Sequence, residues 1–288
     1  MQTILVTGSQ GQLGNEMQTI ARQYPGYQFI FTDVDELDIT NKESLEKFIS
    51  GNKINYLINC AAYTSVDAAE EQVDLCYLIN RDAVKNIGEV TAQHNIQVIH
   101  VSTDYVFNGK SYLPYTEDMP VSPTSIYGKS KRAGEEELLK ANPTSIIIRT
   151  SWLYSSFGNN FVKTMLRLGN ERDSLNVVFD QVGTPTYAAD LATAIMSIID
   201  GGKWESGIYH FSDEGVCSWY DFTKTIHKLA GIQCDVKPIE TKDYPAKTPR
   251  PYYSVLNKAK IKSTYGINIP HWEESLIHCL KLLSGNKQ

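Results

Sequence analysis

The chain has 288 residues and a formal net charge of −6, with 42% apolar and 21% charged residues. This composition is typical of a globular protein with one large core or two unequal ones, and the negative charge gives no basic footprint for nucleic acid. No apolar run approaches the roughly 18–20 residues needed to cross a bilayer, and the N-terminus lacks the zones of a secretion signal. We therefore expect a cytoplasmic protein that binds neither nucleic acid nor a membrane.

The cysteines and histidines predict no cross-links and no metal ligand set. The five cysteines are odd in number and widely spaced, at positions 60, 76, 217, 234 and 279. This spacing argues against a disulfide framework and against a zinc ribbon. Unpaired thiols in a reducing compartment agree with the cytoplasmic expectation.

Short β-rich apolar runs alternate with amphipathic helical runs through the first half of the chain. This alternation is typical of βαβ units and predicts an α/β fold built on a doubly wound parallel sheet of the Rossmann type. Strands are expected at 3–7, 28–33, 56–62, 97–103 and 145–151, and helices at 12–23 and 42–50, in a long region ending near 94, and from 126 onward.

The regular alternation of strand-like and helical runs ends after Ser151, and the last fifty residues are richer in proline. A helix is expected near 158–168, followed by a strand at 175–180, a helix at 188–199, a strand at 207–212 and a closing helix at 272–283. We interpret this as a dinucleotide-binding domain over 1–150, with 176–215 interleaving. A smaller, C-terminal substrate-binding α/β domain comprises 151–175 and 216–288.

The first strand runs directly into "TGSQGQLG", which places Gly8, Gly11 and Gly14 before a helix. Glycines at this spacing allow a tight turn, close approach of the backbone to a pyrophosphate and close packing of helix on strand. The helix N-terminus adds free N–H groups and a positive dipole end for the phosphates. A glycine triplet alone indicates only a turn, but the strand before it and the helix after it favour a dinucleotide site.

Asp33 follows the second strand, where a carboxylate accepts hydrogen bonds from a ribose 2′-hydroxyl and repels a 2′-phosphate. No arginine follows this strand, whereas three further carboxylates do. The local charge therefore favours NADH over NADPH, although both cofactors stay open.

Tyr127 begins the stretch "YGKSK", and residues four apart share one face of a helix, which pairs it with Lys131 and not with Lys129. A free phenol has a pKa of about 10. An ammonium about 4 Å away is expected to lower the pKa of the phenol by a few units. A tyrosine tuned in this way can protonate an alkoxide as hydride reaches a carbonyl.

Thr103 ends the fourth strand, so its hydroxyl should emerge at the carboxyl edge of the parallel sheet and polarise a substrate carbonyl. The same Tyr-x-x-x-Lys spacing recurs at Tyr220 and Lys224, and any single match is more often a surface pair. Because the second pair has no equivalent strand that ends in serine or threonine, we assign catalysis to Thr103, Tyr127 and Lys131.

Together these residues resemble the extended short-chain dehydrogenase/reductase family, and within it the dTDP-4-dehydrorhamnose reductase branch. The resemblance covers essentially the whole chain. The stretches that carry it include "LVTGSQGQLG", "NCAAYTSVDAAE", "INRDAV", "HVSTDYVFNG", "SIYGKSKRAGE", "RTSWLY", "GNNF" and "RPYYSVLN".

The resemblance implies a role for several further residues. Cofactor contacts are implied for Gln10, Gly11, Gln12 and Leu13 at the pyrophosphate, Asp38 and Ile39 at the adenine, and Ala61, Ala62, Tyr63 and Thr64 along the dinucleotide. Substrate contacts are implied for Thr103, Asp104, Trp152, Asn160 and Arg250, the last toward the diphosphate. A tryptophan that merely fills the core and an ordinary surface arginine are the plainer interpretations. Tyr63 stands where some relatives carry histidine, which leaves its contact open.

The expected activity is reduction of the 4-keto group of dTDP-4-dehydro-β-L-rhamnose by NADH or NADPH, with Tyr127 as proton donor. A related dehydratase would carry "TDE" after the fourth strand, whereas this chain carries "TDY". Another 4-keto-6-deoxysugar nucleotide and a regulatory, cofactor-binding role remain as alternatives. The resemblance also implies a homodimer and possible use of Mg²⁺, although the sequence identifies no metal ligands.

Overall fold

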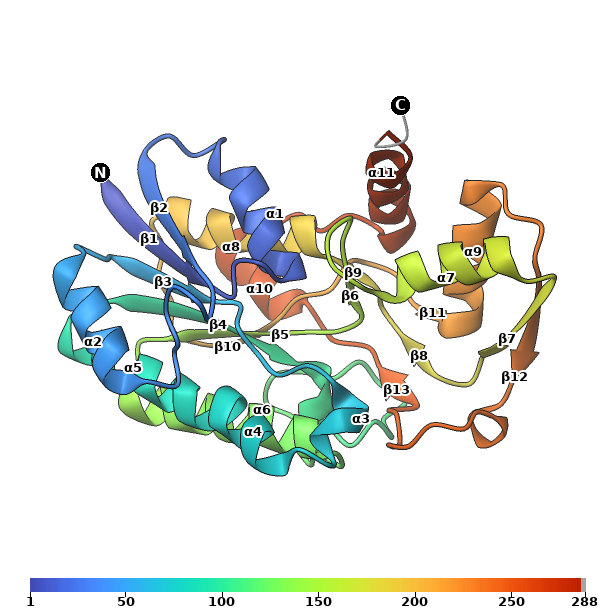
Figure 1. The fold of residues 1–288 in the computed structure, drawn as a ribbon, viewed down its shortest axis with the longest axis horizontal. Coiled ribbons are helices and arrows are strands. Elements are labelled where there is room, and N and C mark those ends of the chain that lie inside the picture. The colour runs from blue at the N-terminus through green and yellow to red at the C-terminus, as the bar shows by residue number, and fades with distance from the viewer. Residues whose placement is uncertain (286–288) are drawn as a thin grey trace.

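Six parallel strands form the main sheet of the computed structural model, which describes residues 1–285, in the order β10–β5–β4–β3–β1–β2 (Figure 1). These strands are β1 (Gln2–Thr7), β2 (Tyr27–Thr32), β3 (Tyr56–Asn59), β4 (Gln97–Thr103), β5 (Ile146–Thr150) and β10 (Gly207–His210). Because β2 and β3 pair with opposite edges of β1, the direction of winding reverses there. Such a reversal opens a crevice at the carboxyl ends of the strands.

Helices cover both faces of this sheet (Figure 1). One face carries α1 (Gln12–Ala21), α8 (Ala188–Asp200) and α10 (Ala259–Tyr265), and the other carries α2 (Lys42–Gly51), α5 (Ala83–Gln93) and α6 (Ile126–Ala141). Strands covered on both faces need nearly continuous apolar sequence, and every residue of β5 is buried. These features confirm the predicted doubly wound, Rossmann-like α/β fold.

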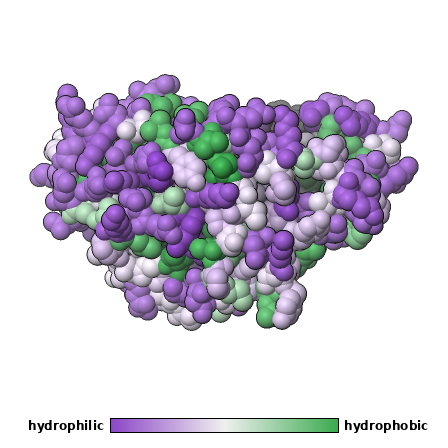
Figure 2. Space-filling model, turned by 90° about the horizontal axis from the view of Figure 1, so that it is seen from below, coloured by the Kyte–Doolittle hydropathy of each residue, from purple (hydrophilic) through white to green (hydrophobic). Residues whose placement is uncertain are grey.

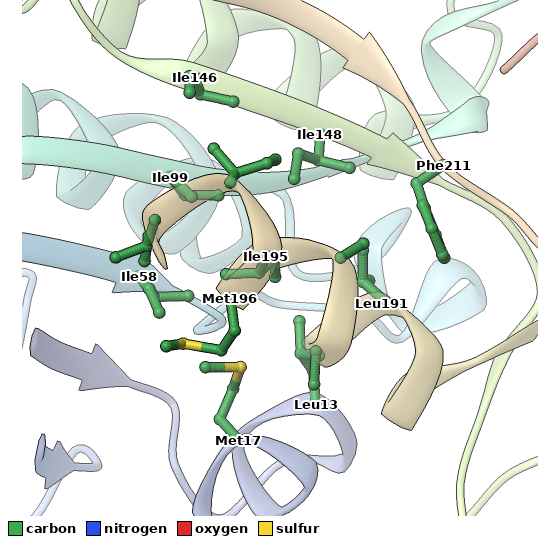
Figure 3. Close-up of a cluster of buried hydrophobic side chains, with 14 of the residues drawn as sticks. Leu13, Met17, Ile58, Ile99, Ile146, Ile148, Leu191, Ile195, Met196 and Phe211 are labelled. Atoms are coloured by element: carbon green, nitrogen blue, oxygen red, sulfur yellow. The ribbon is translucent and has the colours of Figure 1, made fainter. Parts of the chain in front are cut away.

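The larger core lies between the sheet and helices α1 and α8. Figure 3 shows Leu13 and Met17 of α1 facing Leu191, Ile195 and Met196 of α8. Isoleucines from β3, β4 and β5 fill the space above these helices. Burial of these helix faces fixes the start of α1 against β1, which positions the glycine loop.

A second group of elements lies at the far end of the molecule, at the right of Figure 1. It contains α7 (Phe161–Glu171), β7 (Ser174–Val178), α9 (Trp219–Ala230), β12 (Asp235–Ile239) and, beside them, α11 (Trp272–Gly285). Strand β7 pairs with β12 and not with the main sheet. Of the segment 176–215, which was expected to interleave with the first domain, α8 and β10 are the elements that join the main sheet. The division of the chain into two domains stays a prediction.

Two small sheets connect these groups of elements. One has the order β11–β8–β13, with β11 (Cys217–Ser218), β8 (Val182–Gly183) and β13 (Tyr253–Ser254). The other pairs β6 (Leu153–Tyr154) with β9 (Thr186–Tyr187). Strands this short carry no periodic signal, so the sequence predicted none of them. They bring segments from 150 to 255 to the carboxyl edge of the large sheet.

The region expected to be helical up to residue 94 is broken into several parts. They are α3 (Val66–Ala69), α4 (Val73–Tyr77), a π-helix at Leu78–Asp82 and α5. Elsewhere in the chain, short 3₁₀ turns occur at Asp104–Val106 and Thr241–Asp243. A Cβ at Gly134 of α6 would lie 2.0 Å from the carbonyl oxygen of Asn80. Glycine at this position therefore lets α6 pack directly on the π-helix.

The face seen in Figure 2 is mostly hydrophilic, with apolar residues in small separate groups. Within residues 1–285, none of the helices has both the length and the apolar character to cross a membrane. The same part of the chain contains no group of three or more histidine, cysteine, aspartate or glutamate side chains arranged to hold a metal ion.

Candidate active site

The glycine loop has the geometry that its sequence predicts. Gly8 has φ +67°, a left-handed conformation that side chains rarely adopt, and a Cβ there would lie 2.6 Å from the backbone nitrogen of Ala61. A Cβ at Gly14 would lie 2.3 Å from the carbonyl oxygen of Gly8. Only glycine fits these two positions, and the resulting cradle opens onto the start of α1.

A cavity of about 270 Å³ lies beside this loop, between β1, β2 and β3. Among the residues predicted to bind the cofactor, it is lined by Gly8, Gly11, Asp33, Asp38, Ile39, Ala61 and Ala62. Apolar walls with carboxylates at one end suit an adenosine, because the base is flat and the ribose hydroxyls donate hydrogen bonds.

The Asp33 carboxylate stands at this cavity but already has partners. Its Oδ2 accepts from the backbone N–H of Gln10 at 2.9 Å, and its Oδ1 accepts from that of Val34 at 2.9 Å. The carboxylate is therefore held in place at the end of β2. Each carboxylate oxygen has further lone pairs that can accept from a ribose hydroxyl.

A larger cavity of about 550 Å³ continues from the first, because Gly11, Cys60 and Ala62 line both. The predicted residues that line it are Gly11, Gln12, Leu13, Gly14, Ala62, Thr64, Thr103, Asp104, Tyr127, Lys131, Trp152 and Asn160. One continuous space thus joins the glycine cradle to the three residues assigned to catalysis. The phosphate cradle between these cavities and the Asp33 carboxylate in the first one fit a nicotinamide dinucleotide.

Tyr127 and Thr103 lie side by side in the wall of this cavity. The N-cap of α6, Ser125, accepts from the backbone N–H of Gly128 at 3.1 Å and so fixes the helix start two residues from Tyr127. The ring of Tyr105 packs edge-on against that of Tyr127, with centroids 5.4 Å apart. The phenol is therefore held by the first turn of α6 and by one aromatic neighbour.

The expected lowering of the pKa of Tyr127 is wrong. Burial raises the pKa of this phenol above its ordinary value, while a hydrogen bond with Thr103 acts in the opposite direction. Lys131 is engaged elsewhere, because its Nζ donates to the carbonyl oxygen of Val101 at 2.7 Å. Spacing on a helix correctly pairs the two side chains on one face, but it does not reveal what else the lysine contacts.

A buried polar chain continues from Lys131 into the sheet. Its Nζ lies 3.3 Å from His100 Nε2, and His100 Nδ1 lies 2.9 Å from the amide nitrogen of Asn59. The Asn59 amide oxygen accepts from the Thr7 hydroxyl at 2.8 Å and from the Ala61 backbone N–H at 3.2 Å. Burial lowers the pKa of Lys131 to about 8. The sequence signal for this chain is the presence of two polar residues, His100 and Asn59, within otherwise apolar strands. Our sequence analysis did not identify them as part of the site.

Asp104 follows Thr103 and is almost fully buried. Burial raises the pKa of its carboxyl group to about 6, against hydrogen bonds from the hydroxyls of Ser254 and Thr103. Ser254 belongs to β13, so the small sheet anchors this carboxylate at the cavity. A side chain that titrates near 6 at the wall of a cavity is typical of a functional site.

Trp152 has φ +49°, a left-handed conformation that costs a bulky residue roughly 1–3 kcal/mol. Its indole lines the larger cavity and stacks on Trp219 with ring centroids 3.4 Å apart and planes 9° apart. Asn160, the N-cap of α7, donates from its amide nitrogen to the side-chain oxygen of Gln12 at 3.0 Å. The loop that precedes α7 is thereby tied to the start of α1.

Three predicted residues do not line either cavity: Gln10, Tyr63 and Arg250. Gln10 is exposed and acts through its backbone N–H on Asp33. Arg250 donates from Nη2 to Asp67 at 2.7 Å. Tyr63 is held by Asn80, whose amide oxygen accepts from the Tyr63 backbone N–H at 2.9 Å. Asn80 lies in the π-helix, so this irregular turn positions the loop between β3 and α3.

Comparison with known proteins agrees with this geometry. The family model described as "RmlD substrate binding domain" matches residues 1–284. A dTDP-4-dehydrorhamnose reductase from Aggregatibacter actinomycetemcomitans is 43% identical over 96% of this chain and 97% of its own. The crystal structure of a dTDP-4-dehydrorhamnose reductase from Clostridium acetobutylicum has a TM-score of 0.93 and 45% identity, with 98% of this chain and 99% of that chain covered.

The crystal structure of a dTDP-4-dehydrorhamnose reductase from Bacillus anthracis, determined in complex with NADP, has a TM-score of 0.94 and 38% identity. It is covered completely, and 98% of this chain is covered. The match therefore includes the glycine loop, the Tyr127 helix and the small sheets at the cavity. The chain belongs to the family described as RmlD substrate binding domain, as the family model and these full-length relatives show.

Proposed function

We propose that this protein reduces the 4-keto group of dTDP-4-dehydro-β-L-rhamnose and so forms dTDP-L-rhamnose. NADH or NADPH supplies the hydride when bound. The observation that carries this proposal is the single cavity in which Thr103, Tyr127 and Lys131 face the glycine cradle. The names of the relatives at 43% and 45% identity supply the identity of the sugar nucleotide.

Tyr127 is the proton donor in this reaction. Because burial raises the pKa of its phenol, the hydroxyl is fully protonated at neutral pH. A hydroxyl group at the substrate carbonyl polarises it, and Thr103 provides one beside Tyr127 once its proton turns from Asp104 to the substrate. As negative charge develops on the carbonyl oxygen, Tyr127 transfers its proton to that oxygen, and the product is an alcohol.

Lys131 supports the phenol and the cofactor. Its ammonium group is a triple donor, of which the structure assigns one hydrogen to the Val101 carbonyl. A second donor is available to the hydroxyls of a ribose in the cavity. The positive charge favours the phenolate that remains after proton transfer.

The sugar of the sugar nucleotide occupies the part of the cavity beside Thr103 and Tyr127. Asp104 accepts hydrogen bonds from sugar hydroxyls, and Trp152 packs on the sugar. Arg250 is assigned to the diphosphate, and its guanidinium must turn toward the cavity to reach it, because Arg250 lines neither cavity, its Nη2 pairs with Asp67 and its buried Nη1 has no partner among the described residues. A guanidinium group with a free donor suits a phosphate oxygen.

Oxidation of NADPH and of NADH, followed separately with enzymatically generated dTDP-4-dehydrorhamnose, tests the proposal. Turnover with formation of dTDP-L-rhamnose is the expected result. Turnover only with another 4-keto-6-deoxysugar nucleotide would change the substrate and keep the chemistry. Cofactor binding without any turnover would instead support a regulatory subunit and contradict the proposal.

The state of the protein in the cell is part of the proposal. All five cysteines are unpaired, which agrees with a reducing cytoplasm. The implied homodimer is tested by light scattering of the purified protein, in which a mass of about twice the 32.4 kDa of the chain is expected. Addition of EDTA tests whether activity needs Mg²⁺.

A further inference from the structure

Hydrogen bonds from a distant segment hold the backbone at Trp152 in place. The backbone on both sides of its left-handed turn is tied to the segment after β8. The Ser151 hydroxyl donates to the Thr184 carbonyl at 3.0 Å, and the Thr186 hydroxyl donates to the Ser151 carbonyl at 2.6 Å. The Thr186 backbone N–H donates to the Trp152 carbonyl at 3.2 Å.

The indole itself is held between Gly183 and Trp219. A Cβ at position 183 would lie 2.6 Å from Trp152 Cε2, so glycine leaves the space that the ring occupies. Trp219 covers one face of the ring in a nearly parallel stack, with centroids 3.4 Å apart. Two independent contacts therefore fix a side chain whose backbone conformation is strained.

The register of one small sheet aligns both contacts. Cys217 of β11 pairs with Gly183 of β8, and Trp219 follows two residues after Cys217, as the first residue of α9. The N-cap Ser218 and Asp221 form a reciprocal capping box that fixes this helix start. Phe161 of α7 packs against the Trp219 ring at 4.5 Å. The Trp219 ring thus connects the Trp152 indole at the cavity wall to helices α7 and α9.

We propose that Trp219 is a positioning residue for the sugar nucleotide, which acts by holding the Trp152 indole at the cavity wall. This inference rests on the proposed function, because it concerns the same substrate. Trp219 does not line the cavity, whereas Trp152 does. Its loss should therefore weaken sugar-nucleotide binding and leave cofactor binding unchanged. It sets the affinity for the sugar end of the substrate and takes no part in proton transfer.

The test compares Trp219→Leu, Trp219→Phe and a control, Trp204→Leu. Trp204 precedes β10 and donates to the Thr144 carbonyl, which lies just before β5. This is the amino end of the parallel strands, opposite to the cavity. Far-ultraviolet circular dichroism of the wild type should show an exciton couplet from the stacked indoles. Trp219→Leu should abolish the couplet, and Trp204→Leu should keep it.

Affinity for the stable product dTDP-L-rhamnose, titrated with NADP⁺ present, is the functional measurement. The dissociation constant should rise roughly 3- to 10-fold in Trp219→Leu, the change expected for loss of one aromatic pair. It should return toward the wild-type value in Trp219→Phe and stay unchanged in Trp204→Leu. The affinity for NADP⁺ alone should be equal in all of these proteins.

An unchanged dissociation constant in Trp219→Leu would overturn the inference. Equal loss of affinity for product and for NADP⁺ would also overturn it, because that pattern indicates a general structural role. Failure of the proposed function is visible separately, since it shows as absent turnover in the wild-type protein.

Discussion

The Nζ atom of Lys131 lies 3.3 Å from Nε2 of His100, and the tautomer of this histidine decides what the contact does. The Asn59 amide oxygen is committed to Thr7 and Ala61, so its amide nitrogen donates to His100 Nδ1. Neutral His100 then carries its proton on Nε2, directed at the lysine. A donor facing a donor disfavours the ammonium form, in the same direction as burial.

Cofactor affinity should therefore depend on pH near 8. The pKa of Lys131 is lowered to about 8, so the side chain is charged below this pH and neutral above it. A neutral amine loses its charge-assisted hydrogen bond to the ribose. We expect the dissociation constant of NADPH to rise above about pH 8, measured by fluorescence titration. Constant affinity between pH 7 and pH 9 would contradict this role of Lys131.

Asn59→Asp should shift this pH dependence upward. The new carboxylate accepts from both Thr7 and Ala61 and also from a proton on His100 Nδ1, which turns the Nε2 lone pair toward Lys131. Both the lone pair and the added negative charge favour the ammonium, by roughly one pH unit or more. Asn55→Asp, at the amino end of the same strand β3, is the matched control, because among the described residues its side-chain oxygen accepts from the Thr3 N–H alone, at 2.8 Å. Equal pH profiles for the two variants would reject the tautomer argument.

Tyr127→Phe should lower kcat by a factor of roughly 100 to 10,000, which is the usual contribution of a positioned proton donor. Cofactor affinity should stay within a factor of about two, because the phenyl ring keeps the packing against Tyr105. Tyr220→Phe is the control, since it changes the other tyrosine with a lysine four residues later. Loss of activity in Tyr220→Phe and not in Tyr127→Phe would reverse the assignment.

Asp33→Ser should change the preference between the two cofactors. The carboxylate at the first cavity repels a 2′-phosphate, so its removal should raise the ratio of kcat/KM for NADPH over NADH, by roughly tenfold. Asp35→Ser removes a nearby carboxylate that does not line the cavity and should leave the ratio unchanged. An unchanged ratio in Asp33→Ser would show that this side chain does not discriminate between the cofactors.

The parts of the site that the sequence predicts are those controlled by local geometry. Gly8 needs a positive φ next to β1, and Tyr127 and Lys131 share a helix face, so short-range spacing identifies them. The strand boundaries of the main sheet are predicted to within a few residues for the same reason. Long buried strands have a strong apolar signal, as the fully buried β5 shows.

The missed parts depend on contacts between distant segments. Trp219 reaches Trp152 only because β11 pairs with β8, and each of these strands has two residues. His100 contacts Lys131 across 31 positions, and no periodicity records such a contact. The error about the Tyr127 pKa has the same origin, since Coulomb attraction to one lysine was weighed without the burial that the assembled fold imposes.

Removal of one partner from the buried pair of Glu135 and Arg149 should destabilise the protein far more than removal of one partner from an exposed ion pair. Arg149 donates from Nε and Nη2 to the two carboxylate oxygens at 2.8 and 2.7 Å, and both side chains are at most 1% exposed. The Ser102 hydroxyl also donates to Glu135, at 2.6 Å. This cluster locks α6, which carries Tyr127, onto β4, which carries Thr103.

Arg149→Met should lower the free energy of unfolding by about 3–5 kcal/mol, because it leaves the Glu135 charge buried without its main partner. Arg167→Met is the matched control: its pair with Glu171 is as short, at 2.6 Å, but both side chains are more than half exposed, and exposed pairs contribute about 1 kcal/mol or less. Urea denaturation of both variants measures the difference. The double variant Glu135→Leu/Arg149→Met should recover much of the loss, since no unpaired carboxylate remains. Equal destabilisation by Arg149→Met and Arg167→Met would show that burial does not set the strength of this pair.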